Sequence, residues 1–293
     1  EMRLDASRVR GGITYALRTR PAFGARINVD QFNLDAYLPR RRPGSTKPAK
    51  TDKPAAAPSS DENASSGGPA APAGPLAALN GFDANLVVRV GTLNYRRTPI
   101  QGLAFDGSLV RGTLTIRRAG VRNVSGTTGR IAGTLSGFAG FPVFKGSFSA
   151  SSKNVTGLFR IAGIDTPVPP RRLGRLKLSG KADGGADQVK LNTTLELAGA
   201  KISLSGQMAD LGATPRLDLD VRARHPDTAK LARLLGAEIG APKRGLGGFE
   251  LGAKAKGGLD AVDLAARLAA VDAEVTFAGR ITQLAASPAV AGT

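Results

Sequence analysis

The sequence predicts a mostly β protein, in which antiparallel meanders repeat along a curved, groove-like sheet with short helices between the repeats. Three observations support this fold class. Apolar residues alternate with polar or small ones over most of the chain, which places them on one face of a pleated sheet. Turn signals such as Ser125-Gly126 and Gly184-Gly185 separate these stretches at intervals of roughly ten residues. The chain also matches itself at a fixed spacing.

The alternating stretches define one set of apolar positions that share a face of the predicted sheet. Glu196, between Leu195 and Leu197, falls on the opposite face. This pattern is typical of antiparallel sheets with one apolar and one hydrated face. The apolar set comprises Leu86, Val88, Val90, Leu114, Ile116, Leu176, Leu178, Val189, Leu191, Leu195, Leu197, Ile202, Leu204, Leu217, Leu219, Val221, Val262, Leu264 and Leu268.

An internal repeat relates two stretches of the chain's second half. A constant shift, which carries Leu173 onto Leu246, aligns units near 144–216 and 217–289 without a gap. We call it the 73-residue shift. Between 173–208 and 246–281, 13 of 36 positions are identical. The repeat resolves one ambiguity: residues 260–274 have high helix propensity, but they align with 187–200, an alternating strand pair. We therefore expect strands there, because tertiary context overrides propensity.

Short helices are expected between the strands of each unit, near residues 34–38, 155–161 and 227–235. The last of these has the clearest boundaries. Asp227 is placed to cap its N-terminus and Gly236 to end it. The helix is too short to be stable alone, so it must pack on the sheet.

A Pro-rich insert divides the chain into three predicted parts. Residues 1–39 are the end of a β repeat with a truncated N-terminus plus a short helix, 40–76 are a linker, and 77–293 continue the β-repeat domain. The linker is rich in Pro, Ala and Lys and has no large apolar residue before Leu76. It cannot bury enough apolar area to offset its ordering entropy, so we expect it to be disordered. The strands that flank it resemble a looser third copy of the repeat unit, and we interpret the chain as a piece of a longer protein.

Composition argues against catalysis. With no cysteine and one histidine, the chain has no thiol nucleophile, thiolate metal site or two-imidazole site. His225 precedes Pro226 where a strand meets a helix, which favours a turn residue over a base. Asp218 and Asp220 lie near arginines on a polar strand face, which favours ion pairing over a cation site. We expect a protein that is not an enzyme, with no catalytic residue, no metal and no cofactor.

The net charge of +18 points to an anionic partner. The basic residues of the chain are spread over every segment. The tyrosines suited to base stacking, Tyr15, Tyr37 and Tyr95, are far apart in the sequence. We therefore expect no nucleic-acid partner. An anionic membrane surface accounts for the same charge.

A turn motif, an insert and a pair of strand motifs follow one another in the first third of the chain. Residues 32–39 read FNLDAYLP, a Pro/Ala/Lys-rich insert follows, and LNGFDANLVVRVGTLNY begins at Leu79. This order resembles the AsmA family of Gram-negative envelope proteins, which has a similar turn, insert and pair of strands. Arg97 stands where the family usually has glycine, and the resemblance is best over residues 26–148.

The resemblance implies a location, a lipid partner and a role. Members are anchored in the inner membrane by an N-terminal helix, which this chain lacks, and project into the periplasm. Their repeats form a curved sheet with an apolar groove for phospholipid, and they support outer-membrane assembly. The apolar set defined above then lines this groove. The alternative is a structural or scaffolding β-repeat protein of the envelope, which binds protein partners and has no open groove. The sequence leaves the oligomeric state open.

Overall fold

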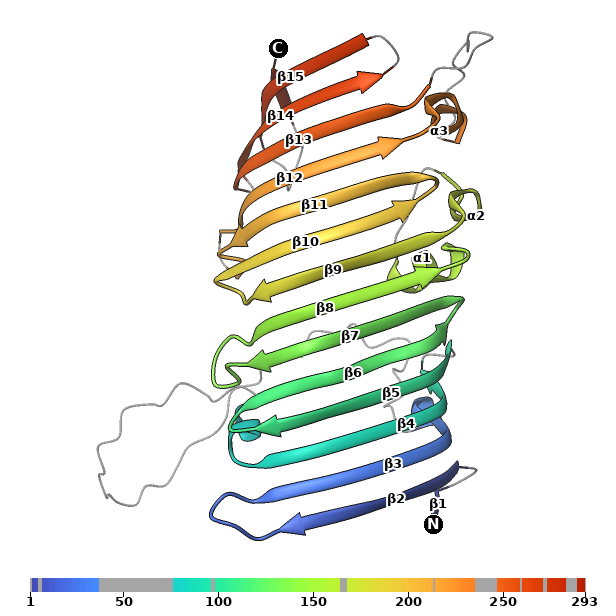
Figure 1. Cartoon of the computed structure of the whole chain (residues 1–293), viewed down its shortest axis with the longest axis vertical. Coiled ribbons are helices and arrows are strands. Elements are labelled where there is room, and N and C mark those ends of the chain that lie inside the picture. The colour runs from blue at the N-terminus through green and yellow to red at the C-terminus, as the bar shows by residue number, and fades with distance from the viewer. Residues whose placement is uncertain are drawn as a thin grey trace, which may run out of the picture.

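The described residues form one open, single-layer sheet of sixteen strands (Figure 1). The structure is a computed structural model that describes residues 2–4, 7–36, 76–95, 98–163, 168–212, 214–234, 247–258, 260–270, 273–282 and 289–292. The strands follow one another across the sheet in the order in which they occur in the sequence. The predicted mostly β, mainly antiparallel fold is confirmed.

Most strands have nine to thirteen residues, and only the two edge strands are short. Their bounds are β1 (Met2–Leu4), β2 (Ser7–Ala16), β3 (Ala22–Asn33), β4 (Asp83–Tyr95), β5 (Thr98–Val110), β6 (Thr113–Val124), β7 (Thr127–Ser136), β8 (Val143–Ser152), β9 (Leu176–Gly184), β10 (Gln188–Leu197), β11 (Ala200–Ala209), β12 (Arg216–His225), β13 (Phe249–Gly258), β14 (Ala261–Ala270), β15 (Ala273–Thr282) and β16 (Ala289–Gly292).

The sequence repeat is visible in the strands. Strands β8, β9, β10 and β11 of the first unit correspond to β12, β13, β14 and β15 of the second, and the same shift carries the bounds of β10 and β11 onto those of β14 and β15. Residues 261–270 and 273–282 are therefore strands, as their repeat partners predict, despite their helix propensity. Burial of one strand face outweighs the intrinsic preference of an Ala- and Leu-rich segment.

One strand pair departs from the repeat pattern. β3 and β4 are parallel, with Ala22 opposite Asp83 and Phe32 opposite Leu93, whereas β8–β9 and β12–β13 are antiparallel. The looser third copy is thus not equivalent in topology to the other two. Parallel neighbours need a connection that returns across the sheet, which a tight turn cannot provide. The chain makes this connection between the 3₁₀ helices η1 (Leu34–Ala36) and η2 (Ala77–Asn80).

The α-helices lie along the side of the sheet that is formed by strand ends, where β8 and β12 end (Figure 1). We call this side the helix-bearing edge. They are α1 (Thr156–Ala162), α2 (Pro170–Leu173) and α3 (Thr228–Leu234). The helices predicted near 155–161 and 227–235 are confirmed within one residue at their described ends, and the one near 34–38 begins with η1. The sequence did not predict α2. The predicted linker at 40–76 falls outside the described residues except for Leu76, as does the predicted helix end at Gly236.

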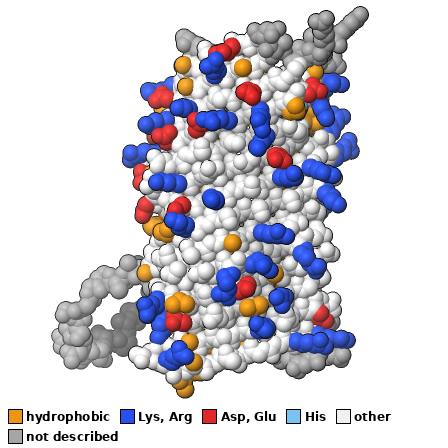
Figure 2. Space-filling view, viewed as in Figure 1, with side chains coloured by type: hydrophobic (Ala, Val, Ile, Leu, Met, Phe, Trp, Pro, Cys, Tyr) orange, Lys and Arg blue, Asp and Glu red, His pale blue; other side chains and the backbone are white. Residues whose placement is uncertain are grey.

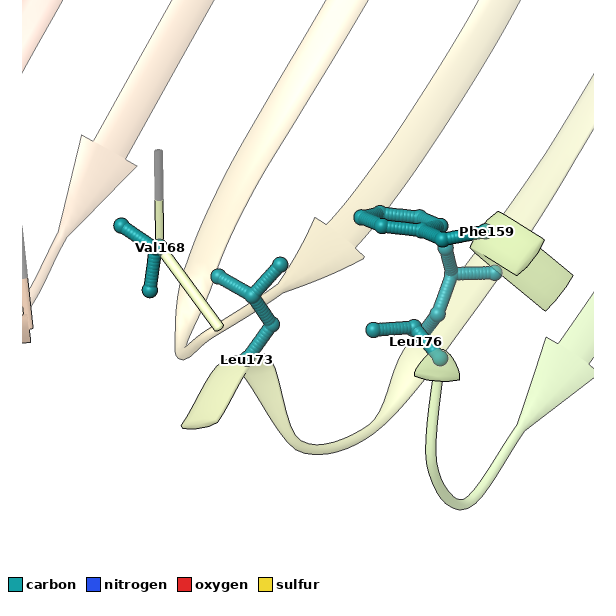
Figure 3. Close-up of a cluster of buried hydrophobic side chains, with 5 residues drawn as sticks. Phe159, Val168, Leu173 and Leu176 are labelled. Atoms are coloured by element: carbon teal, nitrogen blue, oxygen red, sulfur yellow. The ribbon is translucent and has the colours of Figure 1, made fainter. Parts of the chain in front are cut away.

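A compact apolar cluster lies beside α1 and α2. It consists of Val155, Phe159, Val168, Leu173 and Leu176, all buried (Figure 3). The first four come from the α1 and α2 region and the last from the start of β9. Burial of such side chains contributes about 1.5–3 kcal/mol each, so this cluster fixes two short helices that would not form in isolation.

Two glycines allow neighbouring backbones to approach closely at equivalent places in the sheet. Gly133 in β7 has φ 152° and Gly206 in β11 has φ 142°, and the repeat shift carries the first onto the second. A Cβ at Gly133 would collide with the carbonyl oxygen of Lys145, and one at Gly206 with that of Asp218. These two carbonyls are repeat equivalents as well. The close strand approach is therefore part of the repeat.

Candidate functional site: an uncharged sheet face

The strand register separates the sheet into two chemically different faces. Residues directly opposite one another on paired strands point to the same side of a sheet. Leu191 in β10 lies opposite Ala182 in β9 and Gly206 in β11, whereas Lys190 lies opposite Asp183 and Gln207. One face is thus apolar and the other polar. We call them the apolar face and the polar face.

The apolar face is continuous from β4 to β15. From β8 to β15 its strand positions include no Asp, Glu, Lys or Arg, and its only histidine, His225, lies at the helix-bearing edge. Large and small residues share its central row. That row runs through Leu86, Gly107, Ile116, Gly133, Gly146, Ala182, Leu191, Gly206, Leu219, Ala255, Leu264 and Gly279.

All members of the predicted apolar set lie on this one face. The pairings join them across the sheet: Leu114 of β6 connects through Leu109 to β4, and Leu195 of β10 pairs with both Leu178 and Ile202. The alternation in the sequence therefore placed each residue on the correct side. Their role in lipid binding is a separate question.

Several large residues of the apolar face were not in the predicted set. Five of them are repeat counterparts of residues that were. Phe144 and Phe148 correspond to Leu217 and Val221, so the repeat carried the missing signal. The same holds for three residues in the second unit, which are Phe249, Leu251 and Phe277.

The helices cover the end of this face at β9 and β10. Leu178, Leu195 and Leu197 are partly buried against the apolar cluster, together with Leu158 of α1 and Leu234 of α3. These predicted lining residues therefore pack against the buried cluster at the helix-bearing edge. Leu191 and Leu264 lie nearer the middle of their strands and have only Ala or Gly directly opposite. No second sheet covers the apolar face in the part of the chain that the structure describes.

Charged side chains gather on the polar face (Figure 2). Many form exposed ion pairs across neighbouring strands, such as Lys145 with Asp183 at 3.1 Å and Arg280 with Asp263 at 2.7 Å. Asp218 and Asp220, the acids weighed above as a cation site, form ion pairs with Lys256 and Arg222, respectively. Exposed pairs of this kind contribute little to stability, about 0–1 kcal/mol each.

One carboxylate joins three segments at the edge opposite the helices. Asp83 at the start of β4 accepts hydrogen bonds from the Arg111 backbone N–H at 2.9 Å and from Arg20 Nε at 2.6 Å. The bond from Arg111, together with that from Arg20, lowers the pKa of Asp83 below its ordinary value of 3.8. The carboxylate thereby links the β2–β3 and β5–β6 connections to β4.

The histidine weighed above as a base is held in place by backbone atoms. His225 is buried, with 2% of its surface exposed, and both ring nitrogens bond backbone atoms. Among the described residues, no group of three or more His, Asp or Glu residues is placed to hold a metal ion. Nor does any described helix have the length and apolar character needed to span a bilayer.

Comparison with known proteins gives no match: no family model, no curated protein and no solved structure is similar to this chain. The resemblance to the AsmA family therefore rests on the sequence motifs quoted above.

Proposed function

We propose that this protein is an AsmA-like periplasmic protein, anchored in the inner membrane as part of a longer chain, that carries phospholipid between membranes on its apolar face and so supports outer-membrane assembly. The single observation that carries the proposal is the uncharged face from β8 to β15, which no second sheet covers in the described chain. A sheet of this length would otherwise expose a large apolar surface to water, and such surfaces mark binding sites.

The energetics favour an acyl chain as the ligand of this face. Each buried CH₂ contributes about 0.8 kcal/mol, so a chain of about sixteen carbons contributes roughly 12 kcal/mol. The protein needs only to shield the acyl chain from water while the headgroup stays hydrated. Gly and Ala, opposite Leu191 and Leu264, leave room above the backbone for such a chain. We propose no catalytic role and no cofactor.

A structural or scaffolding role is the second candidate, and the apolar cluster at the helix-bearing edge favours it. There Leu195 and Leu197 pack against buried side chains of the cluster. If helices or partner proteins covered the whole face in the same way, no lipid would bind.

Lipid extraction from the purified protein separates these two functions. The chain is purified without detergent, extracted with organic solvent and analysed by mass spectrometry. The lipid-carrier proposal predicts co-purifying phospholipid in stoichiometric amounts. A scaffold predicts phospholipid no higher than in a soluble protein prepared in parallel.

A further inference from the structure

The two repeat units carry opposite charges at equivalent positions of the polar face. In the first unit, Lys145, Asp183 and Lys190 lie in one row across β8, β9 and β10. The equivalent row of the second unit, across β12, β13 and β14, is Asp218, Lys256 and Asp263. A second row shows the same reversal of charge. Lys177 and Lys201 of the first unit correspond to Glu250 and Glu274 of the second.

The second unit balances its charges internally. Asp218 pairs with Lys256, Asp263 with Arg280 and Glu274 with Arg267. The polar face over β12 to β15 carries seven cations and five carboxylates, a smaller positive excess than the six cations and two carboxylates over β7 to β11.

The first unit leaves cations without a carboxylate. The two acids on its strands β8 to β11 already have a lysine partner each, Asp183 with Lys145 and Glu196 with Lys177. No described carboxylate forms an ion pair with the exposed side chains of three other lysines on its strands β9, β10 and β11, which are Lys181, Lys190 and Lys201. The same holds for Arg130 on the neighbouring strand β7. We call these four the cationic patch.

Hydroxyl and amide groups separate the cations of this patch. Arg130 and Lys181 border a shallow basin of about 560 Å³ that contains no carboxylate. Its remaining polar side chains are small, and they are Ser147, Ser149, Ser179, Asn192 and Thr194. Cations and hydroxyl donors on an open surface are the groups that bind phosphoryl oxygens.

We propose that the cationic patch docks this protein onto a bilayer with anionic headgroups. Charge complementarity selects this occupant. A second copy of the chain would offer the polar face of its second unit, where Asp218, Asp263 and Glu274 are already paired with cations of the same chain. The four cations are spread over five adjacent strands from β7 to β11, which suits a planar array of headgroups better than a single linear polymer. The patch lies on the face opposite the proposed acyl-chain site, so the two proposals stand or fall separately.

Vesicle co-sedimentation of the purified chain tests the patch. The probe is a vesicle of three parts phosphatidylcholine to one part phosphatidylglycerol, with pure phosphatidylcholine vesicles for comparison. One variant combines Lys181→Glu, Lys190→Glu and Lys201→Glu. The matched control combines Lys254→Glu, Lys256→Glu and Arg280→Glu, which changes the net charge equally on the same face of the second unit. Thermal melting confirms that both variants fold.

The proposal predicts that the parent binds the anionic vesicles and releases them as salt rises. The first-unit variant should lose at least about tenfold in apparent affinity, and the second-unit control less than about threefold. Equal losses in both variants would show that only net charge matters and would overturn the proposal. So would equal binding to pure phosphatidylcholine, or a parent that binds a soluble polyphosphate and not the vesicles.

Discussion

Ser152 and His225 occupy the same position in the two repeat units and join the same two features of each. The Ser152 hydroxyl lies 3.2 Å from the carbonyl oxygen of Gly126, in the β6–β7 turn, and 2.8 Å from that of Asn154. His225 Nε2 lies 3.1 Å from the Ala198 carbonyl oxygen, in the β10–β11 turn, and Nδ1 accepts the Asp227 N–H at 3.0 Å. Each side chain thus links a hairpin turn to the short segment between its strand and the following helix.

Replacing His225 should loosen α3 from the sheet. His225→Leu removes both bonds and leaves the partly buried Ala198 carbonyl and Asp227 N–H without these partners, which costs at most about 1–3 kcal/mol for each group. We expect a lower melting temperature and faster hydrogen exchange in α3. His225→Ser introduces the residue that the first unit uses and should restore part of the loss. If both variants had the melting temperature of the parent, the hydrogen bonds of His225 would contribute nothing to stability.

Gly206 should tolerate no side chain. Its φ of 142° is one that residues with a Cβ rarely adopt, and an added Cβ would collide with the carbonyl oxygen of Asp218. Gly206→Ala should lower the free energy of unfolding by about 1–3 kcal/mol, measured by urea denaturation. Gly252→Ala is the control, because a Cβ there meets nothing within 4 Å. Equal effects of the two substitutions would contradict this account of the strand approach.

The hydrogen bonds to Asp83 should make stability depend on pH in the acidic range. Its pKa is lowered by folding, so its contribution is present above the ordinary value of 3.8 and is lost as pH falls through the lower pKa of the folded state. Asp83→Asn should therefore lower the melting temperature at pH 7, and the difference from the parent should shrink below about pH 4. Asp187→Asn serves as the control because no side-chain bond to another described residue is found for Asp187. A constant difference across the pH range would refute the prediction.

Aspartate at the centre of the apolar face should displace lipid without unfolding the sheet. Leu191 has only Ala182 and Gly206 directly opposite, so an ionised carboxylate at this position can remain hydrated when the face is empty. Leu191→Asp should therefore reduce co-purified phospholipid severalfold and leave the fold intact. Asn192→Asp adds the same charge one residue away on the polar face and should leave bound lipid unchanged.

Leu195→Asp should behave differently, because Leu195 packs against the apolar cluster. An unpaired charge there lies against buried apolar side chains, and we expect a loss of about 1–3 kcal/mol in the free energy of unfolding. Glu196→Ala should be close to neutral. Similar stability of the Leu191→Asp and Leu195→Asp variants would contradict the distinction between a covered edge and an open centre.

The alternation and the repeat were sufficient to predict the sheet and the side that each strand residue occupies. They succeeded even at β14, where the repeat overrode a helical composition. The parallel pairing of β3 and β4 could not be read from the sequence, because alternation has the same period in both kinds of sheet. The packing of Leu195 against the apolar cluster could not be predicted either. Phe159 and Val168 come from the helical region, and no local sequence pattern specifies what such a region packs against. The charge inversion between Lys190 and Asp263 was present in the aligned repeat, but only the strand register shows which charges are neighbours.

Photo-crosslinking from the two faces of one strand tests the central claim most directly. The chain has no cysteine, so Leu264→Cys on the apolar face and Ala265→Cys on the polar face each give a single labelling site for benzophenone-maleimide. The labelled proteins are incubated with phosphatidylcholine vesicles, which lack net negative charge, irradiated and analysed by intact-protein mass spectrometry. The account predicts a covalent phospholipid adduct from position 264 and none from position 265. Adducts of equal yield from both positions, or from neither, would contradict it.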